Sequence, residues 1–473
     1  MHISSLDGGF GIGSLGDGAR RFVDRISEAG FSYWQVLPMS MTDEYGSPYK
    51  SAASFGANPY FIDIPTLYEE GLLTADEVLR ERGDDSTRVD FSLLSETRIE
   101  LLRLAASRVI DRSEIVDYVE VRAELSRTAY FLALCEANGG RPWQEWESFV
   151  CDIDELYFWQ FVQYKFYSQW FALKEYANAK GIEIIGDLPI YVDINSADTW
   201  AEPEEFLLDG KGYPIEVAGV PPDYFSAEGQ LWGNPLYRWG RMKKDGFSWW
   251  RKRLSHALTM YDGVRIDHFR AIEAYWSVPS GAASAKEGAW KKGPGRAFVR
   301  MLREVAGDKL VIAEDLGDIT DEVRALVDYS GLPGMRVAQF GFLGDENSIH
   351  LPHNIPSRAV AYTGTHDNDT LLGFISSSEG ARRVGLLEYF GIAQTESFEN
   401  DSLRTADAII RTLMISPAEL VVLPVQDIFR LGSEHRMNTP GVASGNWSFR
   451  VSSEMMEKFP VEELRRMNRR YGR

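Results

Sequence analysis

Residues 263–269 read Gly-Val-Arg-Ile-Asp-His-Phe, a short apolar run that ends in an acidic residue. Two later stretches repeat this pattern, Val-Ile-Ala-Glu-Asp-Leu-Gly at 311–317 and Tyr-Thr-Gly-Thr-His-Asp-Asn-Asp at 362–369. The carboxylates that follow the apolar runs are Asp267, Glu314 and Asp367. Acids placed after successive strands are typical of the rim of a parallel barrel, where the C-terminal strand ends carry the chemistry. A cluster of carboxylates at such a rim favours cleavage of a glycosidic bond.

These runs belong to a set of eight short segments that are rich in β-branched and apolar residues. The segments are His2–Leu6, Tyr33–Met39, Ile182–Val192, Gly263–Phe269, Leu310–Leu316, Met335–Phe342, Ala359–His366 and Leu420–Phe429. Strands that alternate with helical patterns indicate parallel βα units. Eight such units in 473 residues predict an α/β protein with a (β/α)8 TIM barrel. An open doubly wound sheet is the alternative, but no complete dinucleotide-binding fingerprint follows any of the strands.

The spacing of the strands predicts one catalytic barrel over 1–473 with helical insertions on its catalytic face. Residues 56–180, after the second strand, are expected to form a largely helical insertion because the periodicity is helical at Thr74–Arg82, Thr97–Arg112 and Asp154–Lys180. A second insertion is expected at 193–262, after the third strand. It contains a Gly- and Pro-rich stretch at 219–235 whose composition predicts an irregular loop. A long loop at a catalytic rim is more often functional than structural.

Composition limits the partners. The chain has 50 Lys and Arg against 70 Asp and Glu, a formal net charge of −20. Such a charge disfavours nucleic acid and anionic membranes but not a neutral sugar. No run of about 18 apolar residues predicts a membrane span. Only two cysteines, Cys135 and Cys151, occur in this long chain, which indicates a reducing compartment. We therefore expect a cytoplasmic protein.

Asp267 has the neighbour that a nucleophilic carboxylate needs. Such a group must be ionised at neutral pH, which a nearby cation favours. Arg265 lies two residues earlier on the same strand and points to the same side. Arg265 is therefore expected to orient Asp267 and to keep it deprotonated. An ion pair that only closes the top of the barrel is the structural alternative.

Glu314 is suited to the opposite role. A general acid needs a raised pKa, which an apolar environment or a neighbouring negative charge supplies. The residues before Glu314 read Leu-Val-Ile-Ala, and Asp315 is expected to point away from it. The alternative is a carboxylate that only begins a helix.

His366 precedes Asp367, and this pair raises the question of a metal site. The sequence His-Asp-Asn-Asp lacks both the spacing of a helical zinc pair and the pattern of an EF-hand loop. We therefore expect no metal and no cofactor. His366 and Asp367 fit better as hydrogen-bonding partners of sugar hydroxyls.

Several further motifs, in order along the chain, make the sequence similar to one known family. They are Gly46-Ser-Pro-Tyr-Lys-Ser51, Asn58-Pro-Tyr60, Ile185-Gly-Asp-Leu-Pro-Ile-Tyr-Val-Asp193, the 219–235 stretch, Arg436-Met-Asn438 with Pro440-Gly441, and Gly445-Asn-Trp-Ser448 with Arg450. The chain resembles the 4-alpha-glucanotransferases of the amylomaltase (disproportionating enzyme) family, glycoside hydrolase family 77, in the alpha-amylase clan. The resemblance runs almost from end to end.

That resemblance implies the role of each residue. Asp267 would be the nucleophile, Glu314 the acid/base and Asp367 the stabiliser of the transition state. Arg265 and His366 would line the subsite of the cleaved glucose, with Asp187 and Tyr49 near it. Four residues of the 219–235 loop would arch over the bound glucan, namely Tyr224, Phe225, Gln230 and Trp232.

The implied activity is transfer of a segment of an alpha-1,4-glucan to the 4-hydroxyl of an acceptor glucan or glucose. Alpha-1,4-glucans and maltooligosaccharides would be the partners. The carboxylates alone do not separate a transferase from a retaining alpha-1,4-glucan hydrolase on the same barrel, because both use a glucosyl-enzyme intermediate. A catalytically silent glucan-binding protein is a second rival, although all three acids are present. The sequence leaves the oligomeric state open.

Overall fold

The central element of the fold is a seven-stranded sheet in which every observed strand pair is parallel. The computed structural model describes residues 1–473 except 84–86, 223–226 and 443. The strands follow the order β1 (Tyr33–Gln35), β2 (Glu183–Leu188), β5 (Gly263–Ile266), β8 (Leu310–Ala313), β9 (Gly334–Val337), β10 (Ala359–Tyr362) and β11 (Leu420–Val422). This order follows the chain, as in a (β/α)8 barrel.

The first predicted strand, His2–Leu6, is wrong. Residues Ile3–Ser5 form a 3-10 helix, with short-range bonds from the N–H of Ser5 to His2 O and of Leu6 to Ile3 O. Ile3 and Leu6 are nevertheless fully buried. The apolar residues therefore indicated burial correctly, but local bonds rather than a ladder satisfy the backbone. The start of the chain lies beside β1, where the indole of Trp34 donates to Met1 O at 2.6 Å.

Two other predicted strands are shorter than expected because a helix begins inside each segment. In Met335–Phe342, β9 ends at Val337 and α13 (Ala338–Gly341) follows. In Leu420–Phe429, β11 ends at Val422 and α17 (Val425–Ile428) follows Pro424. Proline lacks the N–H that a ladder requires and is well suited to precede a helix.

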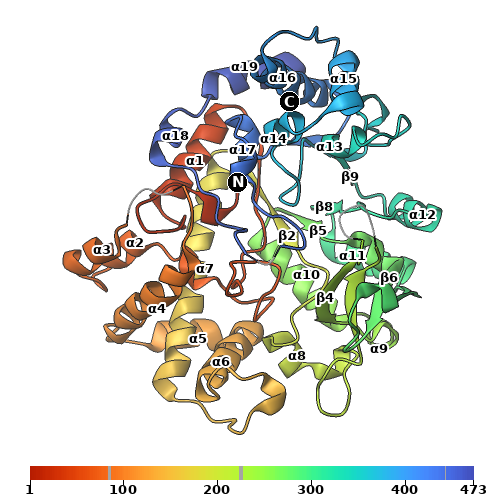
Figure 1. Ribbon diagram of the computed structural model, residues 1–473. Helices are drawn as coiled ribbons and strands as arrows, with labels where there is room; N and C mark the ends of the chain where they lie inside the picture. Colours follow the sequence, from red (N-terminus) through yellow and green to blue (C-terminus); the bar gives the residue numbers. More distant parts are fainter. Residues whose placement is uncertain (84–86, 223–226, 443) are drawn as a thin grey trace.

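Helices α2 to α7 lie between β1 and β2 in the sequence. They are α2 (Ile64–Glu69), α3 (Ala75–Glu81), α4 (Phe91–Ser107), α5 (Ser113–Glu120), α6 (Ala123–Ala137) and α7 (Ile153–Ala179). The predicted helix 154–180 is confirmed as α7, where the side chain of Asp152 caps the N-terminus by accepting the N–H of Asp154 and Glu155. Figure 1 shows α3 to α6 grouped on one side of the barrel strands. The limits proposed for the two insertions, 56–180 and 193–262, stay predictions.

A second, antiparallel sheet has the order β4 (Gln230–Pro235), β3 (Glu216–Val220), β6 (Ala274–Pro279) and β7 (Ala289–Lys292). The prediction of an irregular loop at 219–235 is therefore wrong at both of its ends. Proline is tolerated at the end of β4 because β4 is an edge strand. Glycine is needed at Gly219, where a Cβ would lie 2.5 Å from Gln230 O on the paired strand. Figure 1 shows β4 and β6 on the opposite side of the barrel from α3 to α6.

The remaining helices are distributed along the rest of the chain. They are α1 (Asp17–Glu28), α8 (Ala197–Ala201), α9 (Trp239–Lys244), α10 (Ser248–Met260), α11 (Arg296–Ala306), α12 (Asp321–Ser330), α14 (Leu371–Ser376), α15 (Gly380–Tyr389), α16 (Phe398–Ile415), α18 (Ser453–Glu457) and α19 (Val461–Tyr471). Cys135 and Cys151 are half-buried and unpaired. In the described part of the chain, no helix combines the length and apolar character needed to span a bilayer.

Candidate active site

Asp187, Arg265 and Asp267 lie at the ends of two neighbouring strands. Asp187 on β2 is in register with Arg265 on β5, so both side chains leave the sheet on the same face. Arg265 Nη1 donates to both carboxylate oxygens of Asp187 at 2.7 Å. Arg265 Nη2 lies 3.0 Å from Asp267 Oδ1. The structure thus brings Arg265 and Asp267 together as expected and adds Asp187 to the same network.

Glu314, which follows β8, faces the same guanidinium. Its Oε2 lies 4.0 Å from Arg265 Nη2 and accepts the backbone N–H of His268 at 2.6 Å. Its Oε1 accepts the N–H of Leu316 at 2.8 Å. His268 has a φ of 47°, in the left-handed region that residues other than glycine rarely adopt. The strained backbone directly after Asp267 therefore helps to orient Glu314.

Burial dominates the electrostatics of the two acids. It raises the pKa of Glu314 to about 8 against the opposing charge of Arg265, and the charge of Asp267 adds to the rise. Burial also raises the pKa of Asp267, to about 6, although the adjacent Arg265 favours its ionised form. Arg265 therefore offsets the effect of burial on Asp267 only in part. Near neutral pH the pair offers one ionised and one protonated carboxyl group.

His366 and Asp367 lie in the loop that follows β10. His366 Nε2 is 3.4 Å from Asp367 Oδ1, and burial lowers the pKa of His366, which favours its neutral form. The side-chain amide of Asn438 donates to Asp367 Oδ1 at 2.6 Å. Arg436 Nη2 donates to Asp367 O at 2.5 Å. The charge of Asp367 also contributes to the raised pKa of Asp267.

Tyr49 contacts both Asp187 and His366, and so connects the strand-end residues with the loop that follows β10. Its hydroxyl donates to Asp187 Oδ2 at 2.7 Å, and its ring stacks on His366 with the ring centres 5.1 Å apart. Trp447 packs against both rings, at 5.8 Å from Tyr49 and 5.7 Å from His366. The structure therefore brings four of the predicted substrate-binding residues, Tyr49, Asp187, Arg265 and His366, to one place.

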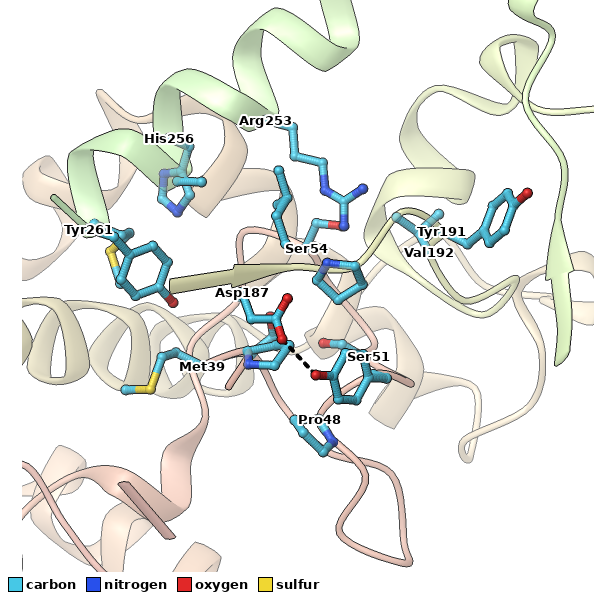
Figure 2. Close-up of a pocket in the computed structure, with 18 of the residues that line it drawn as sticks. Met39, Pro48, Ser51, Ser54, Asp187, Tyr191, Val192, Arg253, His256 and Tyr261 are labelled. Atoms are coloured by element: carbon cyan, nitrogen blue, oxygen red, sulfur yellow. Dashed lines mark hydrogen bonds between the residues drawn. The ribbon is translucent and has the colours of Figure 1, made fainter. Parts of the chain in front are cut away.

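A small cavity borders Asp187 on the side of α10 (Figure 2). Its volume is about 50 Å³, and its lining includes Tyr49, Asp187, Arg253 and His256. The dashed line in Figure 2 marks the hydrogen bond to the carboxylate of Asp187. A cavity of this size holds a few water molecules rather than a sugar ring. A sugar bound near Asp187 must therefore occupy the other side of this carboxylate, where Arg265 and Asp267 lie.

Two of the four predicted loop residues can be placed. Trp232 on β4 packs edge to face against His268, with the ring centres 5.0 Å apart, so it lies beside the residue that follows Asp267. Its indole N–H donates to Gln230 Oε1 at 3.1 Å. Gln230 and Trp232 thus form one unit at the edge of the site. Tyr224 and Phe225 lie outside the described residues.

Sequence reasoning missed four contributions to this site, one of which is Trp447 against Tyr49 and His366. Asn438 and Arg436 belong to a motif that by itself indicates no role for them. In the structure both bind Asp367, from which they are separated by 71 and 69 positions in the sequence. His268 was quoted only as a neighbour of Asp267. A single sequence does not indicate a left-handed backbone at a histidine, so the role of His268 could not be predicted.

Within the ranges that the structure describes, no three or more His, Cys, Asp or Glu side chains are grouped to hold a metal ion. The carboxylates of the site instead contact Arg265, backbone N–H groups and Asn438. The arrangement can supply a nucleophile, a proton donor and several hydrogen bonds to a neutral ligand.

Comparison with known proteins decides between the families that could use such a site. A family profile described as 4-alpha-glucanotransferase, glycoside hydrolase family 77, matches residues 1–455. The chain belongs to the 4-alpha-glucanotransferase family. A 4-alpha-glucanotransferase of Thermus thermophilus is 44% identical, over 95% of this chain and 93% of its own length. That of Clostridium butyricum is 38% identical over 100% of both chains.

The structure of an amylomaltase from Streptococcus agalactiae in complex with acarbose superposes with a TM-score of 0.94. It is 34% identical and covers 100% of this chain and 98% of its own. The comparisons confirm the predicted family, the TIM-barrel fold and the assignment as a 4-alpha-glucanotransferase. The role of each residue stays a prediction.

Proposed function

We propose that this member of the family transfers segments of alpha-1,4-glucans by a retaining double displacement through a glucosyl-Asp267 intermediate. The observation that supports the proposal most directly is the contrast between Glu314 and Asp267 around one guanidinium, that of Arg265. Burial gives Glu314 the higher pKa, which suits a proton donor, and leaves Asp267 the more acidic group, which suits a nucleophile. The Streptococcus agalactiae relative, solved with acarbose, supports a site for sugar-like ligands.

In the first step, an oxygen of Asp267 attacks the anomeric carbon of the donor sugar. The glycosidic C–O bond breaks, and its electron pair leaves with the aglycone oxygen, which takes the proton of Glu314. Arg265 and Asp187 keep the carboxylate of Asp267 aimed at the carbon. Asp367 and His366 bind hydroxyls of the distorted ring, in contacts that strengthen in the transition state.

In the second step, Glu314 accepts the proton of an incoming hydroxyl, whose oxygen attacks the anomeric carbon and displaces Asp267. Two inversions give overall retention. If the hydroxyl is the 4-OH of a glucan, a chain is transferred, and if it is water, the chain is hydrolysed. Transfer prevails when the acceptor subsite holds a sugar and excludes water. Trp232 lies beside His268, where the acceptor would bind.

Products of maltotriose provide the test of this function. A transferase is expected to produce glucose together with a ladder of longer maltooligosaccharides, because glucosyl and maltosyl units are moved between chains. A time-resolved chromatogram measures these products directly. Maltose and glucose without any longer product would instead support the hydrolase alternative.

Trp232→Ala is expected to raise the ratio of hydrolysis to transfer. The indole offers a face for stacking on an acceptor sugar, and its loss should admit water while weakening acceptor binding. The ratio is measured as reducing ends released per chain transferred. Trp290→Ala, at a half-exposed tryptophan on β7 of the same sheet, is the matched control and should keep the wild-type ratio. An unchanged ratio in Trp232→Ala, with both rates reduced together, would mean that the residue serves binding or folding in general.

A further inference from the structure

The loop that carries His366 and Asp367 is closed at its base by one carboxylate. The loop runs from Thr363, just after β10, to Leu371, the first residue of α14. Asp427 on α17 accepts the hydroxyl of Thr363 on Oδ2 at 2.5 Å. It accepts the backbone N–H of Leu371 on Oδ1 at 2.7 Å. One side chain therefore joins the two ends of the segment.

Other residues also hold the loop, and one of them is Ser433, whose hydroxyl donates to Asp369 Oδ2 at 2.7 Å. The N–H and side-chain amide of Gln339 donate to Thr363 O and Asp369 O, so Gln339 stops short of Leu371. Asn438 and Arg436 bind near the tip, where Asn438 contacts both His366 O and Asp367 Oδ1 and Arg436 contacts Asp367 O. Asp427 differs from these anchors because it contacts both Thr363 and Leu371, the two ends of the segment.

The burial of Asp427 at the base of this loop is energetically unfavourable. It is 4% exposed, and no ion pair to it is recorded among the described residues. Burial raises the pKa of Asp427 to about 6, while the hydrogen bonds from Thr363 and Leu371 oppose the rise. Burial of a carboxylate without a cation costs free energy, which its hydrogen bonds offset only in part. Such a residue is therefore more readily explained by a function than by a contribution to stability.

We propose that Asp427 is a positioning residue, which closes the 363–371 loop so that Asp367 meets the sugar ring in the transition state. In this proposal Asp427 acts through Asp367 rather than through a contact with the substrate. The inference rests on the proposed role of Asp367 as the stabiliser. It extends the site to a residue on α17, the short helix that follows β11. The required contacts are hydrogen bonds rather than the charge itself.

Asp427→Ala removes both bonds and is expected to lower kcat on maltotriose by on the order of 100-fold, with KM changed much less, because misplacement of a group that acts in the transition state costs that much. Asp427→Asn should retain most activity. Its amide oxygen can accept the N–H of Leu371, and its NH₂ can donate to the Thr363 oxygen, since a hydroxyl also accepts. If Asp427→Asn and Asp427→Ala lose activity equally, the proposal is overturned.

Thr363 provides a milder pair of variants in case Asp427→Ala does not fold. Thr363→Val breaks one bond at nearly constant volume and should cost roughly tenfold in kcat, the worth of one hydrogen bond to a charged group. Thr363→Ser keeps the hydroxyl and should behave like the wild type. Full kcat in Thr363→Val would contradict the proposed role of Asp427.

The Asp367→Asn background separates positioning from a general loss of stability. If Asp427 acts through Asp367, Asp427→Ala should reduce kcat in that background by less than about threefold, because coupled residues are not additive. A full, additive loss there would overturn the inference while leaving the proposed function intact. Wild-type activity in Asp367→Asn alone would refute the role of Asp367 and, with it, the inference.

Discussion

Asp267→Asn is expected to lower kcat/KM on maltooligosaccharides by roughly 10⁴-fold or more, the size of loss that follows removal of a catalytic nucleophile. This corresponds to about 5 kcal/mol of lost transition-state stabilisation. The amide is nearly isosteric but is a poor nucleophile, so the covalent route is closed. Arg265 would still be held by Asp187 at 2.7 Å, which should preserve the site around the changed group.

Asp198→Asn is the matched control for this substitution. Asp198 is also buried, but only its Oδ2 has a partner, the N–H of Ser54 at 2.8 Å. The same exchange of carboxylate for amide should therefore leave the chemistry unchanged. A comparable loss in both variants would mean that any amide in this region disrupts the fold, which thermal unfolding would reveal as a lowered Tm.

Covalent trapping identifies the nucleophile without any substitution. A fluorinated glucosyl donor with a good leaving group should accumulate the glucosyl-enzyme, and peptide mass spectrometry should find the label on Asp267. A label on Glu314 or Asp369 would overturn the assignment.

Glu314→Gln is expected to show a large loss that depends on the leaving group. On maltooligosaccharides the first step needs a proton donor, and general acid catalysis contributes about 10²–10⁴-fold. On glucosyl fluoride little protonation is needed, so the first step should be nearly normal, as measured by fluoride release in a single turnover. Equal losses with both donors would argue that Glu314 has another role.

The structure suggests a control for the geometry of this variant. Both oxygens of Glu314 accept backbone N–H groups, from His268 and Leu316, so the glutamine NH₂ must face one of these donors. Glu314→Ala avoids this opposition of two hydrogen-bond donors. Added azide should restore turnover of the glucosyl-enzyme in this variant by attacking the anomeric carbon, giving an alpha-glucosyl azide. Failure of azide to restore turnover after a normal first step would contradict the proposed second step.

The same two acids set the expected pH dependence. The proposed mechanism needs Asp267 ionised and Glu314 protonated, so activity should fall below the lower apparent pKa, about 6, and above the higher one, about 8. In Glu314→Gln the alkaline fall of the first step should disappear with glucosyl fluoride. Its persistence would assign that titration to another group.

The carboxylates proposed for catalysis could be located in the sequence because a strand end is a local feature. Asp267 and Glu314 each follow a short apolar run, and parallel strands in sequential order bring such ends to one rim. The pairing of Arg265 with Asp267 follows from a spacing of two residues on one strand. The errors arose where a short segment had no such regular context. Ile3–Ser5 is apolar and buried but forms a 3-10 helix, and Gln230–Pro235 has a loop-like composition but pairs with β3.

By itself, the sequence determined the barrel and the family and located the carboxylates proposed for catalysis, since strand periodicity and motifs lie in consecutive residues. Only the tertiary structure decided how those groups are tuned. The raised pKa of Glu314 comes from burial, to which many distant segments contribute. The placement of Asp367 depends on Asn438, and that of its loop on Asp427, 64 residues after Thr363. Such contacts join residues whose separation along the chain carries no local pattern, because hydrogen bonds between distant segments exist only after the chain has folded.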